Sequence, residues 1–195
     1  MRLAALLLAA GASRRMRGGD KLLEVVGGRP LIRERAEMLL AAGLPVRVAL
    51  PCPGTARRAA LDGLAVTAVD VPDAAQGMAA SIRAGIAALP PGLDGVLILP
   101  ADMPEITAED IRTACAAFGG KRPLRATSAD GVAGHPVLFP ARLFPDLLRL
   151  GGDSGAKDLL KREGFDRVPL PGRHALTDLD TPEDWAAWRA GGERG

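Results

Sequence analysis

Hydrophobic residues gather in short aliphatic runs, separated by stretches whose apolar positions follow helical spacing. The runs cover residues 2–10, 45–50, 64–69 and 95–100, and each has the length of a strand that is buried on both faces. Residues 31–43, 54–61, 77–89 and 107–118 between them have helical patterns. Strand and helix patterns therefore alternate, which predicts an α/β fold with a mostly parallel sheet and helices on both of its faces.

The regular alternation of strand and helix patterns ends after the last of these predicted helices. From residue 119 to residue 152 the predicted strands are short and glycines interrupt them. A chain of 195 residues suits one domain. We therefore predict a single domain over residues 1–195, in which residues 119–152 form a small flap lobe on the carboxyl edge of the sheet.

The distribution of charged residues bears on which classes of binding partner the protein can have. The 25 basic and 23 acidic residues are interspersed, which disfavours binding to nucleic acid or to a membrane surface.

Cys52 and Cys115 lie far apart and are expected to be small buried residues rather than metal ligands or a disulfide.

The first run also has features of a secretory signal peptide. It begins with Arg2 and ends in small residues at Ala10 to Ala12, as a cleavage site does. A single arginine and an apolar stretch of about eight residues are weak for a signal, and removal would delete the strand best suited to the centre of the sheet. We therefore expect a buried strand and a cytoplasmic protein.

The strand at residues 2–10 runs into the glycine turn and basic loop LAAGASRRMRGGDK. In an open parallel sheet, ligands bind beyond the carboxyl ends of the strands. Small residues from Ala9 through Ala10 and Gly11 to Ala12 would let backbone amides approach a phosphate, and Arg14, Arg15 and Lys21 would supply positive charge. The alternative interpretation is a basic surface loop without a ligand.

Aspartates follow one predicted strand and precede one predicted helix start. Asp102 comes directly after the run at residues 95–100 and could hold Mg²⁺ beside the phosphates. Alternation along an extended segment puts Asp178 and Asp180 on the same side, and one of the two, with Asp180 preferred, could complete the metal site. An ordinary turn at Asp102 and a capped helix start at Thr181 are the alternatives.

Six motifs occur in the order in which they occur in the MobA-like nucleotidyltransferases, and the chain resembles that family over nearly its whole length. The motifs are LAAGASRRM with DK from Leu8, QGMAASI from Gln76, PADMP from Pro100, GHPVLFP from Gly134, GGDSGAKDLL from Gly151 and DLDTPED from Asp178. Within the family the LAAG and GHPVLFP motifs are most similar to the molybdenum cofactor cytidylyltransferases. The resemblance implies a three-layer, Rossmann-like nucleotidyltransferase fold.

The resemblance also implies roles for particular residues. It assigns the catalytic role to Arg15, Lys21 and Asp102, and metal binding, by Mg²⁺ or else Mn²⁺, to Asp102 and Asp180. His135 is expected to orient the substrate or contact the pterin, and Asp153 and Lys157 to lie in an acceptor-side loop. The alternatives are a hydrogen bond from His135 that holds the flap and a capped helix start at the second segment. The residues expected to bind the nucleotide or the acceptor are Leu8, Ala9, Ala10, Gly11, Arg15, Lys21, Gly77, Met78, Ser81 and His135.

The implied reaction is transfer of CMP from CTP to the phosphate of molybdopterin, with release of pyrophosphate. The GGDK sequence in the basic loop is similar to the guanylyltransferase branch, so GTP is the alternative nucleotide. Another phosphorylated acceptor remains open, as does a molybdopterin- or nucleotide-binding chaperone without enzymatic activity. A molybdenum hydroxylase apo-enzyme or its chaperone is a possible protein partner.

Overall fold

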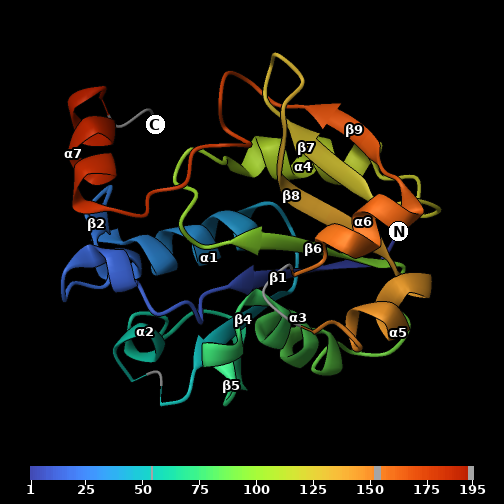
Figure 1. The fold of residues 1–195 in the computed structure, drawn as a ribbon, viewed down its shortest axis with the longest axis horizontal. Helices are drawn as coiled ribbons and strands as arrows, with labels where there is room; N and C mark the ends of the chain where they lie inside the picture. Colours follow the sequence, from blue (N-terminus) through green and yellow to red (C-terminus); the bar gives the residue numbers. More distant parts are fainter. Residues whose placement is uncertain (54, 152–154, 193–195) are drawn as a thin grey trace.

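The computed structural model describes residues 1–53, 55–151 and 155–192 (Figure 1). The strands are β1 Leu3–Leu8, β2 Val25–Val26, β3 Arg29–Pro30, β4 Val46–Pro51, β5 Val66–Val71, β6 Gly95–Pro100, β7 Leu124–Thr127, β8 Ala133–Pro140 and β9 Asp166–Pro169. The helices are α1 Leu31–Ala41, α2 Thr55–Ala59, α3 Met78–Ala87, α4 Ala108–Ala117, α5 Phe144–Leu147, α6 Lys157–Glu163 and α7 Pro182–Ala190. The four runs expected to be strands are β1, β4, β5 and β6, and the four expected helices are α1 to α4.

Seven strands form one sheet in the order β5-β4-β1-β6-β8-β7-β9. Neighbouring strands are parallel except around β8, which is antiparallel to both β6 and β7. The mostly parallel α/β architecture is therefore confirmed. The region 119–152, expected to be a flap lobe, differs in detail because its two strands, β7 and β8, lie within the main sheet.

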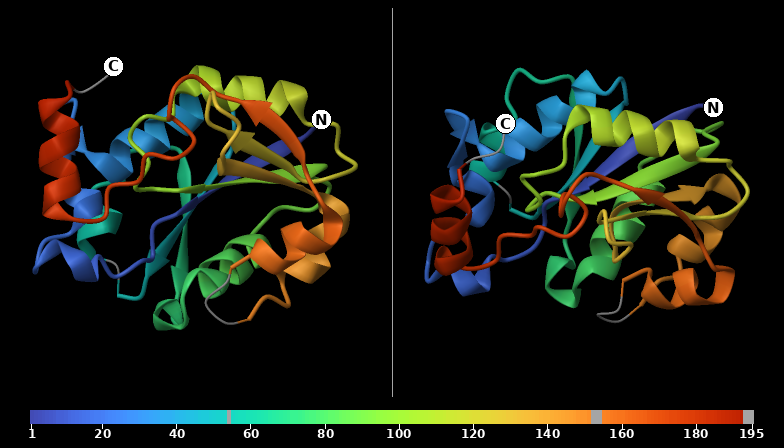
Figure 2. Two further views of the ribbon diagram at one scale, coloured as in Figure 1. Left: turned by 45° about the horizontal axis from the view of Figure 1, so that its top comes forward. Right: turned by 90° about the horizontal axis from the view of Figure 1, so that it is seen from above.

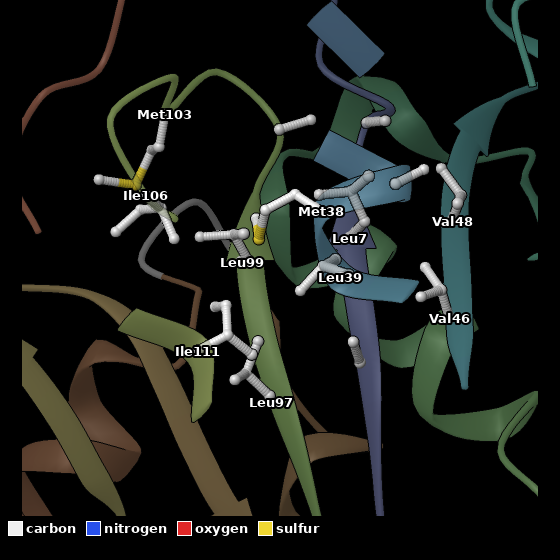
Figure 3. Close-up of a cluster of buried hydrophobic side chains, with 14 of the residues drawn as sticks. Leu7, Met38, Leu39, Val46, Val48, Leu97, Leu99, Met103, Ile106 and Ile111 are labelled. Atoms are coloured by element: carbon white, nitrogen blue, oxygen red, sulfur yellow. The ribbon is translucent and has the colours of Figure 1, made fainter. Parts of the chain in front are cut away.

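The two faces of the sheet carry separate cores, and β1 contributes to both. Ala5 and Leu7 of β1 belong to a cluster with buried residues of α1 and α4, whereas Leu6 and Leu8 pack with α3, α5 and α6. This division follows from the alternation of side chains along a strand. Figure 2 shows the helices on both faces, and Figure 3 shows part of the first cluster around Leu7 and Leu99. The expected three layers are present.

Capping boxes fix the starts of two helices. In α4, Thr107 Oγ1 accepts a hydrogen bond from Asp110 N at 3.1 Å, and Asp110 Oδ2 accepts one from Thr107 N at 2.9 Å. The same reciprocal pair joins Thr181 and Asp184 at the start of α7. The first cap ends the loop that follows Asp102, and the second starts α7 directly after Asp180.

The cysteines are less buried than expected. Cys52 is exposed and Cys115 is half-buried, so the interpretation of both as buried small residues is wrong for Cys52, which lies in the turn after β4. Burial raises the pKa of the Cys115 thiol to about 11. Among the residues that the structure describes, no helix is long and apolar enough to cross a bilayer.

Candidate active site

A cavity of about 740 Å³ lies at the carboxyl ends of the central strands. Leu8 at the end of β1 pairs with Pro100 at the end of β6, and β4 flanks β1 on its other side. β4 and β6 lie on opposite sides of β1, so the order of strands reverses here, and open α/β sheets bind ligands at such a point. Asp102 lies two residues beyond Pro100 and lines the cavity.

Most of the residues predicted for the site line this one cavity. They come from β1 and its loop, from the start of α3, and from the segments after β6 and before α7: Leu8, Ala10, Gly11, Arg15, Lys21, Gly77, Met78, Ser81, Asp102 and Asp180. A Cβ atom at Gly11 would meet no protein atom within 4 Å, so a glycine leaves this part of the cavity open for a ligand. Gly77 has φ of 90°, a conformation that a glycine adopts without strain where α3 begins.

Three predicted residues lie elsewhere: Ala9, His135 and Lys157, the last of which lines a second, neighbouring cavity with His135. Ala9 is buried and does not line the cavity, because its N–H donates to Ala49 O at 2.9 Å and its carbonyl accepts from Arg57. The expectation that its amide approaches a phosphate is therefore not met. Asp153 lies outside the described residues.

The basic loop after β1 is held by an arginine that the sequence interpretation missed. Arg57 of α2 is buried, and its guanidinium donates to both carboxylate oxygens of Asp20 at 2.7 and 2.8 Å and to Ala9 O at 2.6 Å. A further bond of 3.1 Å reaches Ser13 Oγ, and Ser13 has φ of 47°, in the left-handed region. Partial burial alone would raise the pKa of Asp20, but the bonds and charge of Arg57 hold it below its usual value. Arg57 thus fixes both ends of the loop.

Replacing Arg57 with methionine should loosen this loop and destabilise the fold. The change leaves the Asp20 carboxylate without its counter-charge and the Ala9 carbonyl without its side-chain donor, and loss of one partner of a buried ion pair is strongly destabilising. We expect the free energy of unfolding to fall by about 3 kcal/mol. Urea unfolding measures it, with Arg58→Met as the control because Arg58 pairs with Asp70 at an exposed position. Equal losses in both variants would contradict the assigned role.

Lys21 joins the two predicted metal ligands. Its Nζ lies 2.5 Å from Asp102 Oδ2 and 2.6 Å from Asp180 Oδ1, and Arg15 contacts the other oxygen of Asp180 at 2.8 Å. Burial alone would lower the pKa of Lys21, but the charge and hydrogen bonds of the two aspartates hold it above its ordinary value. The cluster therefore contains a fully charged ammonium between two carboxylates, at the edge of a cavity that Arg15 also lines.

The carboxylate oxygens of Asp102 and Asp180 suit a divalent cation that is also bound by oxygens of a substrate. Asp102 Oδ1 is buried and has no hydrogen-bond partner, so one carboxylate oxygen is free to bind a metal. Hard cations such as Mg²⁺ and Mn²⁺ prefer carboxylate and phosphate oxygens. Within the described part of the chain, no three His, Cys, Asp or Glu side chains form a complete metal site. A cation here would be held by Asp102 and Asp180 together with oxygens from a bound ligand.

Asp178 lies beside this cluster but does not enter its ion pairs. Partial desolvation and the negative charges of Asp102 and Asp180 raise its pKa. The ion pairs with Lys21 and Arg15 are instead made by Asp180. A backbone bond from Leu179 N to Asp102 O, 3.1 Å long, fixes the segment of Asp178 to Asp180 against the end of β6. The geometry thus favours Asp180 over Asp178 as the second metal ligand.

His135 should make stability depend on pH. Burial, with the charge of Arg125, lowers its pKa to about 4, whereas the same residue in the unfolded chain has a pKa of about 6.5. Between these values the unfolded state binds more protons, so stability is complete above about pH 6.5 and falls as the pH drops toward 4. We expect a loss of about 2 kcal/mol between pH 7 and pH 5. Urea unfolding of the wild type and of His135→Asn at the two pH values measures the difference, and an equal loss in the variant would contradict it.

A cavity at the strand ends, an open glycine turn, cationic side chains and paired carboxylates define a nucleotide-binding α/β protein whose site is suited to phosphorus chemistry. The model of the MobA-like NTP transferase domain matches residues 5–168. The chain therefore belongs to the MobA-like NTP transferase family and is a nucleotidyltransferase.

Relatives and solved structures agree with this family. The chain is 32% identical over 192 residues to a molybdenum cofactor guanylyltransferase of Cereibacter sphaeroides, covering 95% of each chain. It is 36% identical over 147 residues to the protein of the same name from a Bradyrhizobium strain, covering 73% of this chain and 68% of the relative. The crystal structure of Rv0371c from Mycobacterium tuberculosis superposes with a TM-score of 0.85 at 26% identity, covering 96% of this chain and 97% of the other. Rv0371c has also been solved in complex with manganese, and that structure matches with a TM-score of 0.82 at 24% identity, over 96% and 97% of the two chains.

Proposed function

We propose that this protein transfers GMP from GTP to the phosphate of molybdopterin and releases pyrophosphate. The main structural support for nucleotidyl transfer is the cluster of Lys21, Asp102 and Asp180 at the edge of the main cavity. The choice of nucleotide and acceptor rests on the relatives named molybdenum cofactor guanylyltransferase. GTP thereby takes the place of CTP, which the sequence motifs favoured.

In the proposed reaction the loop after β1 binds the triphosphate. Arg15 and Lys21 would contact its phosphates, and the open turn at Gly11 would admit them close to the backbone. Gly77, Met78 and Ser81 also line the cavity, at the start of α3, and there we place the base and ribose. Binding of this kind holds the α-phosphorus in a fixed position, which contributes much of the rate in phosphoryl chemistry.

Bond making and breaking take place at the α-phosphorus. An oxygen of the acceptor phosphate forms a bond to it, while the bond from the α-phosphorus to the oxygen that bridges to the β-phosphate breaks. The electron pair leaves with pyrophosphate, whose growing charge Arg15 and Lys21 stabilise. The attacking phosphate is already ionised, so no residue has to remove a proton.

Asp102 and Asp180 would hold a divalent cation during the reaction. The cation supplies charge neutralisation and orientation of the phosphate oxygens when it is bound. For the two carboxylates to do so, Lys21 must exchange its bonds with them for bonds to phosphate oxygens. The unpartnered Oδ1 atom of Asp102 supports this arrangement, and the manganese complex of Rv0371c is consistent with a divalent cation in a protein of this fold. Mg²⁺ is the ion we propose.

Cytidylyl transfer is the second candidate. The motifs LAAG at residues 8–11 and GHPVLFP at residues 134–140 favour it, because they resemble the cytidylyltransferase branch. One assay separates the two candidates: pyrophosphate release measured with molybdopterin, Mg²⁺ and each of GTP, CTP, ATP and UTP in turn. We expect GTP to give the highest kcat/KM. The highest value with CTP would overturn the guanylyl assignment, and no release with any of the four would indicate a binding protein or a different acceptor.

A further inference from the structure

The segment that carries Asp180 contains no helix or strand. It covers residues 170–181, between β9 and α7, and Figure 1 shows it in orange and red. Pro171 lacks a backbone N–H and Gly172 has φ of 48°, so neither residue continues β9. A segment without a regular ladder of backbone bonds depends on other contacts for its position. The position of Asp180 therefore depends on what holds this β9–α7 segment.

Backbone contacts fix two points of the β9–α7 segment. A Cβ atom at Gly134 would lie 1.8 Å from Ala175 O, so glycine alone permits the close approach of the segment to β8. Within the described part of the chain, one bond between backbone groups joins residues 176–180 to a distant element, from Leu179 N to Asp102 O at 3.1 Å. The residues closest to the metal site thus have little backbone support, and side chains must supply the rest.

His174 joins the segment to the start of α4. Its Nδ1 lies 2.8 Å from Asp110 Oδ2, and the ring donates because a carboxylate only accepts. The side chain of Asp110 is 5% exposed and that of His174 is 22% exposed, so the bond is largely shielded from water. Asp110 is itself held in place, because the same oxygen accepts from the N–H and the hydroxyl of Thr107 in the capping box. His174 is thus bonded to a fixed, buried carboxylate.

The same carboxylate is connected to the loop that follows Asp102. Arg35 of α1 is buried and donates to the carbonyls of Met103 and Ile106 at 2.9 and 2.5 Å. Burial lowers the pKa of Arg35, and nearby carboxylates, Asp110 among them, oppose this shift. The loop after Asp102, the start of α4 and His174 therefore belong to one connected polar group beneath the site.

A second side-chain bond lies closer to Asp180. Thr177 Oγ1 donates to Glu105 Oε2 at 2.8 Å, which joins the β9–α7 segment to the loop that begins after β6. Thr177 and Glu105 are both half-buried, so this bond is less shielded than that of His174. The two bonds hold the segment that carries Asp180 against the loop that carries Asp102.

We propose that His174 is a positioning residue for metal binding: its bond to Asp110 holds the β9–α7 segment where Asp180 faces Asp102. Thr177 adds a weaker bond of the same kind. His174 lines neither of the two cavities, so it acts through the segment and not by contact with a ligand. This proposal rests on the metal site of the proposed function and adds to that site a residue that binds neither the cation nor the nucleotide.

Four variants on the segment form the test. His174→Leu removes the bond to Asp110 and keeps a side chain of moderate size. His174→Asn is the conservative variant, because its amide nitrogen lies near the position of Nδ1 and still donates. Thr177→Val removes the second bond. Arg173→Leu is the matched control at the adjacent residue, whose side chain is exposed.

The main measurement is the Kd for Mn²⁺ of the nucleotide-free protein, from electron paramagnetic resonance of the free ion. We expect the Kd to rise about tenfold in His174→Leu and about threefold in Thr177→Val, because groups that orient metal ligands change metal affinity by factors of this order. His174→Asn and Arg173→Leu should stay within about twofold of the wild type.

Steady-state transfer separates positioning from substrate binding. In His174→Leu the Mg²⁺ concentration that gives half the maximal rate should rise by the same factor as the Kd for Mn²⁺. The KM for GTP and the kcat at saturating Mg²⁺ should stay within about twofold of the wild type, because the residues that contact the substrate are unchanged.

A merely structural bond would give a different result. His174→Leu would then unfold at a lower temperature, but the folded protein would bind Mn²⁺ as the wild type does, and this result would overturn the proposal. An equal loss of affinity in His174→Asn would also overturn it, since the donor is retained. If His174→Leu does not fold, Thr177→Val decides, and a Kd equal to that of the wild type would overturn the proposal.

The Mn²⁺ titration does not depend on the reaction. If no nucleotide is transferred in any assay but His174→Leu loses Mn²⁺ affinity as expected, the proposed function fails and the positioning role stands. If the wild type transfers GMP and all four variants bind Mn²⁺ alike, the proposed function stands and the positioning role fails. Absence of Mn²⁺ binding to the wild type would overturn the positioning role together with the metal site.

Discussion

Replacing Asp102 with asparagine should reduce kcat/KM for nucleotidyl transfer by about 10³-fold while the protein remains folded. The change keeps the shape of the side chain and removes the charge that would bind the cation. The side chain is mostly buried beside Lys21, which retains its bond of 2.6 Å to Asp180 in the variant. Pyrophosphate release at saturating GTP and Mg²⁺ measures the loss, and thermal unfolding confirms the fold.

Asp178→Asn is the matched control for this change. It removes the same charge from the same neighbourhood, at a residue that makes none of the ion pairs with Lys21 or Arg15. We expect activity within about tenfold of the wild type, because a nearby charge that does not bind the cation alters only the local potential. A larger loss in Asp178→Asn than in Asp180→Asn would reverse the assignment of the second metal ligand.

Lys21→Gln should have opposite effects on catalysis and on metal binding. Removal of the ammonium should lower kcat/KM by about 10²-fold or more, because its charge no longer stabilises the departing pyrophosphate. In the nucleotide-free protein the same change leaves Asp102 and Asp180 without their shared cation. We therefore expect Mn²⁺ to bind the variant about tenfold more tightly than it binds the wild type.

Electron paramagnetic resonance of free Mn²⁺ measures this affinity, and Lys121→Gln is the control at an exposed lysine outside the cavity. A purely structural role for Lys21 would lower activity and metal affinity together. Weaker Mn²⁺ binding in Lys21→Gln would therefore show that the lysine supports the carboxylates rather than competing for them.

The sequence predicted the parts of the site that depend on local pattern. The aliphatic run before Gly11 and the run before Asp102 could be recognised because buried parallel strands are short and uniformly apolar. Asp180 could be proposed as a partner of Asp102 from its position before a predicted helix start and from the order of motifs, although the two residues are 78 positions apart. The structure brings both to Lys21.

The parts that escaped prediction depend on tertiary contacts. Arg57 and Arg58 are adjacent in one basic helix and look alike in sequence, yet Arg57 is buried against the loop and Arg58 is exposed. Burial of an arginine is decided by the partners it meets, which here lie 37 residues away at Asp20. Likewise, no pattern within 133–140 shows that β8 pairs in the antiparallel direction with β6, because strand direction is set by the connections between strands.

The contacts of α7 have a consequence for how the enzyme is made. Figure 1 shows α7 beside β2, and bonds join Arg17 to Glu183 and Arg189 to Glu24, across more than 160 residues of sequence. Chains fold from the N-terminus as they leave the ribosome, so β1 and its loop emerge first and residues 178–189 emerge late. The pocket is assembled only when the late segment returns to the early one. A ribosome-bound chain that has not yet reached Asp180 therefore lacks the second carboxylate of the Lys21 cluster and has no complete site.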